Sequence, residues 1–279
     1  MARFTCNFIS YTLVRTVDIT VVIPSVTIPE SMSATGALIS QATKAEGFAG
    51  AATRPQHTRA EKYPVLYLLH GFGNNHATWT GYTNLELYAE ERNIAVVMIS
   101  AENKSYVNQG KLDRFDDFIE NELPDFICGM FPVSTRPEDT FIAGLSMGGF
   151  GALVHGLSHP EKYAAIGAFS PAVSLNTALL AGLEDQGMPP AQDPLWLAQQ
   201  LHAAGKPIPT LYLACGEKDF LFASLSAYRT QLMDLGYEPT WVTHPTYGHE
   251  WRFWDMQVER FLDWIPRSDA YASAGKRQI

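Results

Sequence analysis

The sequence predicts an α/β fold in which a mostly parallel central sheet carries helices on both of its faces. Two observations favour this class. Short apolar runs that do not alternate, as expected of strands buried on both faces, recur after residue 63, and segments of helical character separate them. This succession indicates βαβ units. The expected strands are 64–69, 94–99, 140–144, 164–169, 210–215 and 241–244, and the expected helices are 84–91, 114–128, 149–159, 194–204, 224–235 and 250–265.

The first residues of the chain follow a different pattern. Residues 5–24 are rich in β-branched and aromatic side chains and predict an antiparallel hairpin of two strands. Boundary signals support the helices further on. Asp193 and Pro194 supply an N-cap and a first-turn proline, and Gly205 and Gly236 stand where helix C-caps are expected.

The length of 279 residues fits one α/β domain, which we expect over residues 1–266. A stretch dominated by Ser, Thr, Ala, Gly and Pro interrupts it at residues 25–61. Because this stretch is too long for a simple connection, we expect an insertion or lid-like excursion, with a floppy surface loop as the alternative. Residues 267–279 are small and polar and predict a flexible C-terminal tail.

Composition excludes several classes of function. A net charge of −9 without a run of Lys or Arg argues against nucleic-acid binding. Three cysteines without a CxxC spacing predict neither a disulfide framework nor a zinc cluster, and we expect no metal and no organic cofactor. Since we find neither a long apolar stretch nor a signal-peptide pattern, we expect a cytoplasmic protein without a membrane partner. The sequence is compatible with a homo-oligomer.

The strongest local signal is the pentapeptide 144–148, which reads G-x-S-x-G around Ser146. It follows an apolar strand and opens a Gly/Ala-rich helix, the context of a nucleophile elbow. There the serine sits on a sharp strand-to-helix turn, and glycines keep neighbouring side chains from colliding. We therefore interpret Ser146 as a catalytic nucleophile. The alternative, a glycine-rich turn with a hydrogen-bonded serine, does not explain why four glycines crowd around one serine.

A second glycine-rich segment, His-Gly-Phe-Gly-Asn-Asn at residues 70–75, directly follows the strand 64–69. In α/β-hydrolases a loop at this place supplies part of the oxyanion hole through backbone N–H groups. The N–H groups of Phe72 and Met147 are the candidate donors for the tetrahedral intermediate. We interpret His70 as a residue that orients this loop rather than as a base.

A serine nucleophile needs a base, and the base needs an orienting acid. In this fold they follow in the order serine, acid, histidine. Of the eight histidines, His249 lies just before the last expected helix, where the base belongs. Asp219 directly follows the strand 210–215 and is the candidate acid, with Glu217 as the alternative. A helix N-cap is the structural interpretation of Asp219.

Four segments together resemble a known family. PVLYLLHGFGNNHATW, FIAGLSMGGFGAL, GEKDF and YGHEW are similar to motifs of the esterase D-like family of α/β-hydrolases, and most similar to those of bacterial tributyrin and acetyl esterases. The resemblance runs from about residue 63 to residue 265. It implies the α/β-hydrolase fold, with Ser146 as nucleophile, Asp219 as acid and His249 as base.

These observations predict a serine carboxylesterase that hydrolyses short-chain acyl esters through an acyl-enzyme on Ser146. Feruloyl or aryl esterase, S-formylglutathione-type thioesterase and acyltransferase activity share the same triad and are the alternatives. A catalytically silent binding protein is the non-enzymatic alternative. Gly71, Trp79, Tyr106 and Trp251 are the candidate residues of the substrate pocket, although core packing explains the aromatic ones at least as well.

Overall fold

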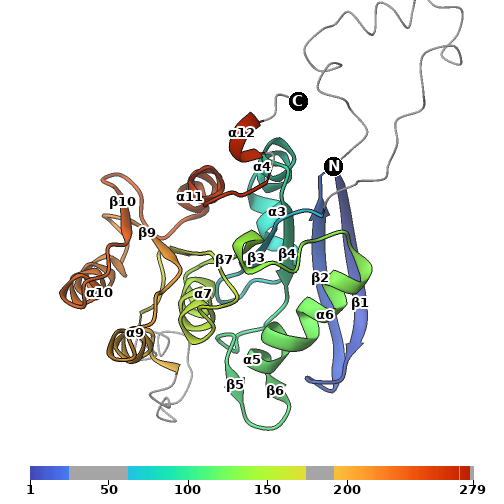
Figure 1. The fold of residues 1–279 in the computed structure, drawn as a ribbon, viewed down its shortest axis with the longest axis horizontal. Helices are drawn as coiled ribbons and strands as arrows, with labels where there is room; N and C mark the ends of the chain where they lie inside the picture. The colour runs from blue at the N-terminus through green and yellow to red at the C-terminus, as the bar shows by residue number, and fades with distance from the viewer. Residues whose placement is uncertain (25–61, 174–191, 270, 277–279) are drawn as a thin grey trace, which may run out of the picture.

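The computed structural model describes residues 1–24, 62–173, 192–269 and 271–276. Its strands are β1 (Ala2–Ser10), β2 (Arg15–Ile23), β3 (Val65–Leu69), β4 (Ala95–Ile99), β5 (Asn108–Gln109), β6 (Asp113–Arg114), β7 (Thr140–Leu145), β8 (Ala165–Phe169), β9 (Thr210–Gly216) and β10 (Thr240–His244). Eight of them form one sheet in the order β1-β2-β4-β3-β7-β8-β9-β10, and β5 and β6 pair separately (Figure 1).

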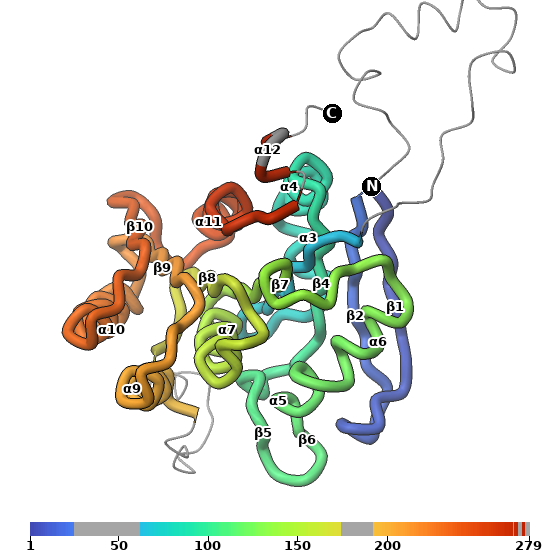
Figure 2. Tube along the Cα trace, in the orientation of Figure 1, coloured from blue at the N-terminus to red at the C-terminus, as the bar shows by residue number. Residues whose placement is uncertain are grey.

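Every pairing from β4 to β10 is parallel, whereas β1 pairs with β2, and β2 with β4, in antiparallel fashion. The antiparallel hairpin forms one edge of the sheet, and β10 forms the other (Figure 2). The central strands β3, β4 and β8 are buried at every position, which explains why their sequences are continuous apolar runs. The predicted mostly parallel sheet with an N-terminal hairpin is confirmed.

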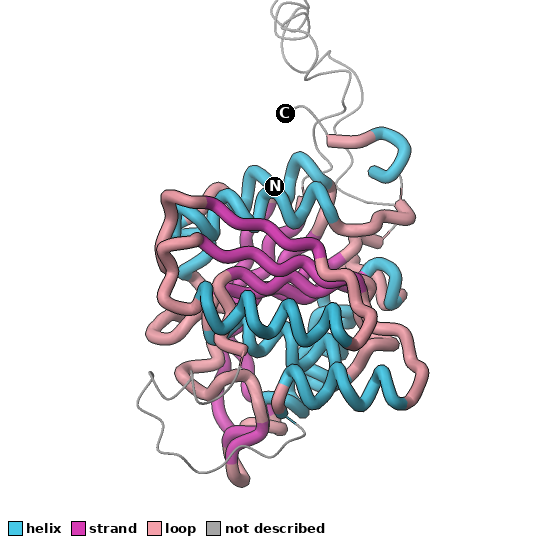
Figure 3. Tube along the Cα trace, turned by 90° about the vertical axis from the view of Figure 1, so that its left-hand side faces the viewer, coloured by secondary structure: helices cyan, strands magenta, loops and turns pink. Residues whose placement is uncertain are grey.

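Helices lie on both sides of the sheet (Figure 3). They are α3 (Thr78–Tyr82), α4 (Leu85–Arg92), α5 (Phe115–Asp117), the π-helix η1 (Phe118–Glu122), α6 (Leu123–Met130), the 3₁₀-helix η2 (Pro137–Asp139), α7 (Met147–Ser158), α9 (Pro194–Ala203), α10 (Phe222–Asp234), α11 (Trp251–Trp264) and α12 (Tyr271–Ala274). One hydrophobic core joins the sheet to η1, α6, α7, α9 and α10, and a second core joins its other face to α3, α4 and α11.

One element differs from the sequence-based expectation. The helix expected at 114–128 is divided, because the π-helix η1 separates α5 from α6. In the segment 267–279 the described residues include α12, and the Arg267 side chain donates to the carbonyl of Arg92 at 2.9 Å; the flexibility of this tail stays a prediction. The excursion expected at 25–61 lies outside the described residues. Within the part of the chain that the structure describes, no helix has the length and apolar character needed to cross a membrane.

Candidate active site

A cavity of about 520 Å³ opens at the carboxyl ends of the parallel strands. The loops after β3, β7 and β9 border it, together with the loop between β10 and α11, as expected where an α/β sheet holds its ligands. Its walls are mainly apolar and aromatic. The lining residues are Gly71, Phe72, Asn74, Ser105, Leu145, Ser146, Met147, Phe150, Ala172, Phe220, Leu221, His249, Glu250, Trp251 and Trp254.

Ser146 occupies the turn between β7 and α7 in a backbone conformation that side chains rarely adopt, with φ 52° and ψ −115°. Its N–H donates to the Phe169 carbonyl at 2.9 Å, which ties the turn to strand β8. Toward the other neighbouring strand, Gly148 permits close packing against the end of β3, because a Cβ there would stand 2.6 Å from the carbonyl oxygen of His70. The turn thus has the strain and the crowding of a nucleophile elbow, and Ser146 faces the cavity.

The structure brings together the three side chains that the chain order suggested. The Nε2 atom of His249 lies 3.0 Å from the Ser146 hydroxyl, and its Nδ1 atom lies 2.8 Å from a carboxylate oxygen of Asp219. Because an ionised carboxylate only accepts hydrogen bonds, Nδ1 carries the proton. With Nδ1 protonated, Nε2 of the neutral ring is an acceptor that faces the Ser146 hydroxyl.

Asp219 is buried beneath this histidine, and its ionised form is well supported. Burial opposes the charge, but hydrogen bonds from His249, from the N–H of Leu221 at 2.9 Å and from the Ser170 hydroxyl lower the pKa of Asp219. Ser170 also accepts the indole N–H of Trp254 at 3.2 Å. Since the indole can only donate, the Ser170 proton stays available for Asp219.

Glu217, the alternative acid, points elsewhere. Its carboxylate accepts a hydrogen bond from the Thr243 hydroxyl at 3.0 Å on the exposed surface. Asp219 is therefore the carboxylate that contacts the histidine of this site.

The loop after β3 is held by His70. The N–H of Ala101 donates to Nε2 of His70 at 3.0 Å, so the ring proton resides on Nδ1, which donates to the Gly71 carbonyl at 2.7 Å. Burial lowers the pKa of His70 to about 4, which keeps the ring neutral. The Gly71 carbonyl belongs to the same peptide unit as the N–H of Phe72. His70 therefore fixes the peptide that sequence reasoning suggested as an oxyanion donor.

Met147, the other suggested donor, is the first residue of α7 and lines the cavity. The first N–H groups of a helix have no partner within it, and they lie at the positive end of its dipole. An anion beside Ser146 would meet this helix terminus.

The four suggested pocket residues divide into two pairs. Gly71 and Trp251 line the cavity, whereas Trp79 and Tyr106 do not. Both of the latter are fully buried, and their polar atoms bond to backbone: the Trp79 indole donates to the Leu69 carbonyl at 3.1 Å, and the Tyr106 hydroxyl donates to that of His70 at 2.8 Å.

The sequence analysis named neither Phe220 nor Trp254 as a candidate pocket residue, and both line the cavity. Phe220 is 64% exposed, and its ring centroid lies 4.7 Å from that of His249. Trp254 is buried, and its ring centroid lies 4.9 Å from that of His249. The adjacency of Phe220 to Asp219 and the place of Trp254 in the first helical turns after His249 are the signals that could have found them. Among the described residues, no group of three His, Cys, Asp or Glu side chains could hold a metal ion.

Comparisons with known proteins show the family and the fold. Residues 50–258 match the family model described as Putative esterase. An acetyl esterase of Caldicellulosiruptor saccharolyticus is 28% identical, over 75% of this chain and 85% of the relative. Two solved structures from Staphylococcus aureus superimpose closely. FphF, a fluorophosphonate-binding serine hydrolase, has a TM-score of 0.77 at 24% identity, covering 95% of this chain and 98% of its own. The S-formylglutathione hydrolase FrmB has a TM-score of 0.76 at 25% identity with the same coverage.

The fold and the matched structures define an α/β-hydrolase-type enzyme, as the sequence predicted. The chain belongs to the esterase family whose model it matches over residues 50–258. It is a carboxylic-ester hydrolase that acts on a small-molecule ester.

Proposed function

We propose that the protein is a serine carboxylesterase that hydrolyses short-chain acyl esters through an acyl-enzyme on Ser146. The observation that carries the proposal is the continuous hydrogen-bonded chain from Ser146 through His249 to Asp219 at the wall of an apolar cavity. A serine hydroxyl is a weak nucleophile, and this arrangement supplies the base that it needs.

In the proposed mechanism the Ser146 oxygen attacks the ester carbonyl while its proton passes to Nε2 of His249. Asp219 then stabilises the imidazolium. Collapse of the tetrahedral intermediate breaks the bond to the alcohol oxygen, and the proton on Nε2 goes to the departing alcohol. A water molecule, deprotonated by the same nitrogen, attacks the acyl-enzyme and releases the carboxylic acid and the free serine.

The tetrahedral intermediate carries a negative oxygen, for which we propose the N–H groups of Phe72 and Met147 as donors. Two features support this assignment. Both residues line the cavity beside Ser146, and His70 fixes the peptide unit that contains the N–H of Phe72. Loss of one such donor costs about 100–1000-fold in rate.

The residues that line the cavity favour an uncharged ester as the substrate. Glu250 and the base His249 are the only ionisable side chains among the described lining residues, and Lys and Arg are absent from them. A glutathione thioester carries carboxylates that a cationic pocket would favour, so these walls speak for a simple acyl ester. The acetyl esterase relative points in the same direction.

A feruloyl or aryl esterase is the second candidate, because aromatic side chains stand at the cavity. Phe220 and Phe72 are exposed beside the site, and the exposed ring of Tyr82 stacks on Trp251 with centroids 5.0 Å apart. A flat phenolic group could stack on such a surface. A panel of p-nitrophenyl esters of increasing chain length, run beside methyl ferulate, separates the two candidates.

The proposal is tested with the variant Ser146→Ala. We expect wild-type protein to hydrolyse p-nitrophenyl acetate and to react covalently with a fluorophosphonate probe, and we expect Ser146→Ala to lose both reactions. Turnover near the wild-type rate in the variant would contradict the mechanism. A wild-type protein that neither turns over esters nor takes up the probe would instead identify a silent binding protein.

Three further properties stay predictions from the sequence. They are a single domain over residues 1–266, a cytoplasmic location, and an oligomeric state that the sequence does not define.

A further inference from the structure

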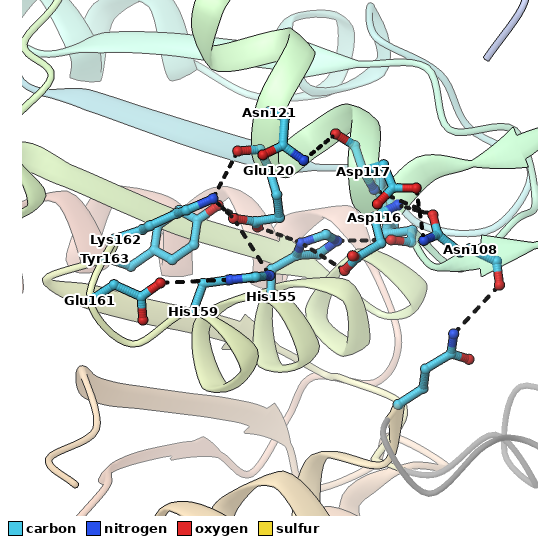
Figure 4. Close-up of polar contacts among 12 residues, drawn as sticks. Asn108, Asp116, Asp117, Glu120, Asn121, His155, His159, Glu161, Lys162 and Tyr163 are labelled. Atoms are coloured by element: carbon cyan, nitrogen blue, oxygen red, sulfur yellow. Dashed lines mark hydrogen bonds and ion pairs between the residues drawn. The ribbon is translucent and has the colours of Figure 1, made fainter. Parts of the chain in front are cut away.

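A buried cluster of charged side chains joins α7, the helix that follows Ser146, to the π-helix η1 (Figure 4). Its centre is Glu120 of the π-helix η1, whose carboxylate lies 2.7 Å from Nδ1 of His155 in α7. The Tyr163 hydroxyl donates to the same carboxylate at 2.8 Å, and the Lys162 ammonium donates to it at 3.0 Å. Glu120 and His155 are almost completely buried, and neither lines the cavity. The proposed mechanism uses neither of them.

His155 is a cation in this cluster. Its Nδ1 faces the Glu120 carboxylate, with Asp116 further away at 3.8 Å, and its Nε2 lies 2.8 Å from the backbone carbonyl of Tyr106. Both close partners only accept hydrogen bonds, so both ring nitrogens must carry protons. Burial opposes this charge, but Glu120 raises the pKa of His155. The imidazolium thus makes a charge-assisted hydrogen bond to the Tyr106 carbonyl.

The residue that His155 holds is strained. Ser105 and Tyr106 have φ angles of 53° and 65°, two consecutive non-glycine residues in the left-handed region. Such conformations cost free energy and persist only where the surroundings hold them. The Tyr106 ring also packs against α7, where a Cβ on Gly151 would stand 2.7 Å from it. The hydrogen bond to His155 and this contact fix Tyr106 from one side.

On its other side Tyr106 reaches the loop after β3. Its hydroxyl donates to the His70 carbonyl at 2.8 Å, and the His70 ring in turn donates to the Gly71 carbonyl at 2.7 Å. Two successive peptide units are thereby fixed. In a trans peptide the carbonyl and the N–H point in opposite directions, so a hydrogen bond on the Gly71 carbonyl sets the direction of the N–H of Phe72.

We propose that Tyr106 is a positioning residue for the loop after β3, residues 70–75, which contains the N–H of Phe72. We further propose that the buried Glu120–His155 ion pair holds Tyr106 in place. This inference rests on the proposed function, because it takes the N–H of Phe72 as an oxyanion donor. It gives this buried cluster a role in the rate of the reaction, although none of its members touches the substrate.

The direct test is the variant Tyr106→Phe, which deletes the hydroxyl and keeps the ring. We expect kcat for p-nitrophenyl acetate to fall about tenfold, short of the 100–1000-fold that loss of a whole donor costs, with KM changed less than about twofold. The inhibition constant of a trifluoromethyl ketone, which forms an anionic hemiketal on the nucleophile, should rise by the same factor as kcat falls.

Tyr63→Phe is the matched control. Tyr63 is equally buried, and its hydroxyl also donates to a backbone carbonyl, that of Pro24 at 2.9 Å. It precedes β3, the strand whose other end leads to His70. We expect loss of the Tyr63 hydroxyl to lower thermal stability and to leave kcat and the inhibition constant unchanged. Equal kcat and inhibition constants in Tyr106→Phe and wild type would overturn the proposal.

The anchor is tested with Glu120→Gln, which removes the counter-charge of His155. We expect kcat to fall in Glu120→Gln alone. In the double variant Glu120→Gln/Tyr106→Phe, the further loss relative to Tyr106→Phe should be less than half of that single-variant loss in free energy of activation, because both changes act through one chain of contacts. Fully additive losses would contradict the anchoring role. Wild-type turnover and probe labelling, measured in the same series, report separately on the proposed function.

Discussion

Two histidine–carboxylate pairs lie near α7, and their hydrogen bonds are nearly equal in length. One pair contacts Ser146, which precedes the helix, and the other includes His155 of the helix itself. His249 lies 2.8 Å from Asp219, and His155 lies 2.7 Å from Glu120. Their second ring nitrogens differ. That of His249 meets the hydroxyl of Ser146, which can donate, whereas that of His155 meets a backbone carbonyl, which cannot. The first ring therefore has a partner from which it can accept a proton, as the proposed base must, whereas the second carries protons on both nitrogens.

Exposure separates the two histidines further. The side chain of His249 is 21% exposed at the cavity and that of His155 is 0% exposed, whereas both carboxylates are buried, Asp219 at 0% and Glu120 at 2%. In the proposed mechanism His249 can therefore exchange a proton with a bound ester, and His155 cannot. The comparison shows that a short bond to a carboxylate does not by itself make a histidine a base. The partner of the other nitrogen decides the role.

The largest expected effect separates the two histidines by activity. Because His249 is proposed to move the proton, His249→Ala should lower kcat on p-nitrophenyl acetate by about 10⁴-fold or more, while the melting temperature changes little. His155→Ala should lower kcat no more than Tyr106→Phe does when both are assayed at a temperature where the protein is folded. Steady-state kinetics with circular dichroism measures both quantities, and equal losses of kcat in the two variants would erase the distinction.

The second effect separates the pairs by stability. His155→Ala removes the closest cation of the buried Glu120 carboxylate and the donor to the Tyr106 carbonyl, while the Lys162 ammonium stays 3.0 Å from that carboxylate. Breaking a buried pair costs about 3–5 kcal/mol of the free energy of unfolding, and because Lys162 remains we expect a loss at the lower end of this range. Chemical denaturation measures this loss. For His249→Ala we expect a much smaller change, because the His249 side chain is 21% exposed and the buried Asp219 carboxylate keeps its hydrogen bonds from Leu221 and Ser170. If His249→Ala destabilised the protein as much as His155→Ala, the exposure of the histidine would not be what distinguishes the two pairs.

The third effect is the pH dependence of stability. Burial opposes ionisation of Glu120, but His155 and Lys162 hold its pKa at about 2, below the ordinary 4.5, so its contribution is complete above pH 4.5 and is lost as the pH falls toward 2. The pKa of His155 is raised above the ordinary 6.5, so its contribution is complete below pH 6.5 and is lost as the pH rises through the raised value.

The ion pair therefore stabilises the fold most fully between about pH 4.5 and 6.5. The neighbouring groups Asp116, His159, Lys162 and Tyr163 remain in place in Glu120→Gln. Melting temperatures of this variant should vary less than those of wild type on both sides of that window. Parallel curves for the two proteins would show that the pair is not charged.

The smallest expected effect concerns the support of Asp219. Ser170→Ala removes one hydrogen-bond donor from the carboxylate, and we expect kcat to fall about tenfold, because a hydrogen bond to an ionised group contributes about 1.5–3 kcal/mol. Ser10→Ala is the matched control, since Ser10 is also fully buried and donates to a carboxylate, that of Glu122 at 2.6 Å, away from the cavity. A normal kcat in Ser170→Ala would show that His249 and Leu221 suffice to hold Asp219.

The parts of the site that lie next to a strand end could be predicted from the sequence. Ser146 and Asp219 directly follow apolar strands, and His249 precedes the last long helix, so local patterns and chain order were enough to select them. The α/β class was also predictable from local patterns, because parallel strands that are buried on both faces have continuous apolar sequences.

The supporting contacts could not be predicted, because they join residues far apart in the chain. His155 and Tyr106 are 49 positions apart, and His155 looks like one more residue of an apolar helix. The aromatic character of Tyr106 suggested a pocket wall, but its hydroxyl has a partner in the core. Only the three-dimensional arrangement shows which polar atom each buried side chain meets.

The central claim, an acyl-enzyme on Ser146, is tested most directly by trapping it. Wild-type protein is mixed with p-nitrophenyl acetate, quenched in acid during turnover, digested and examined by mass spectrometry. We predict an acetyl group on the peptide that contains Ser146, with fragment ions that place it on that serine, and none in Ser146→Ala. Steady hydrolysis without acetylation of Ser146, or acetylation of another residue in its place, would contradict the account.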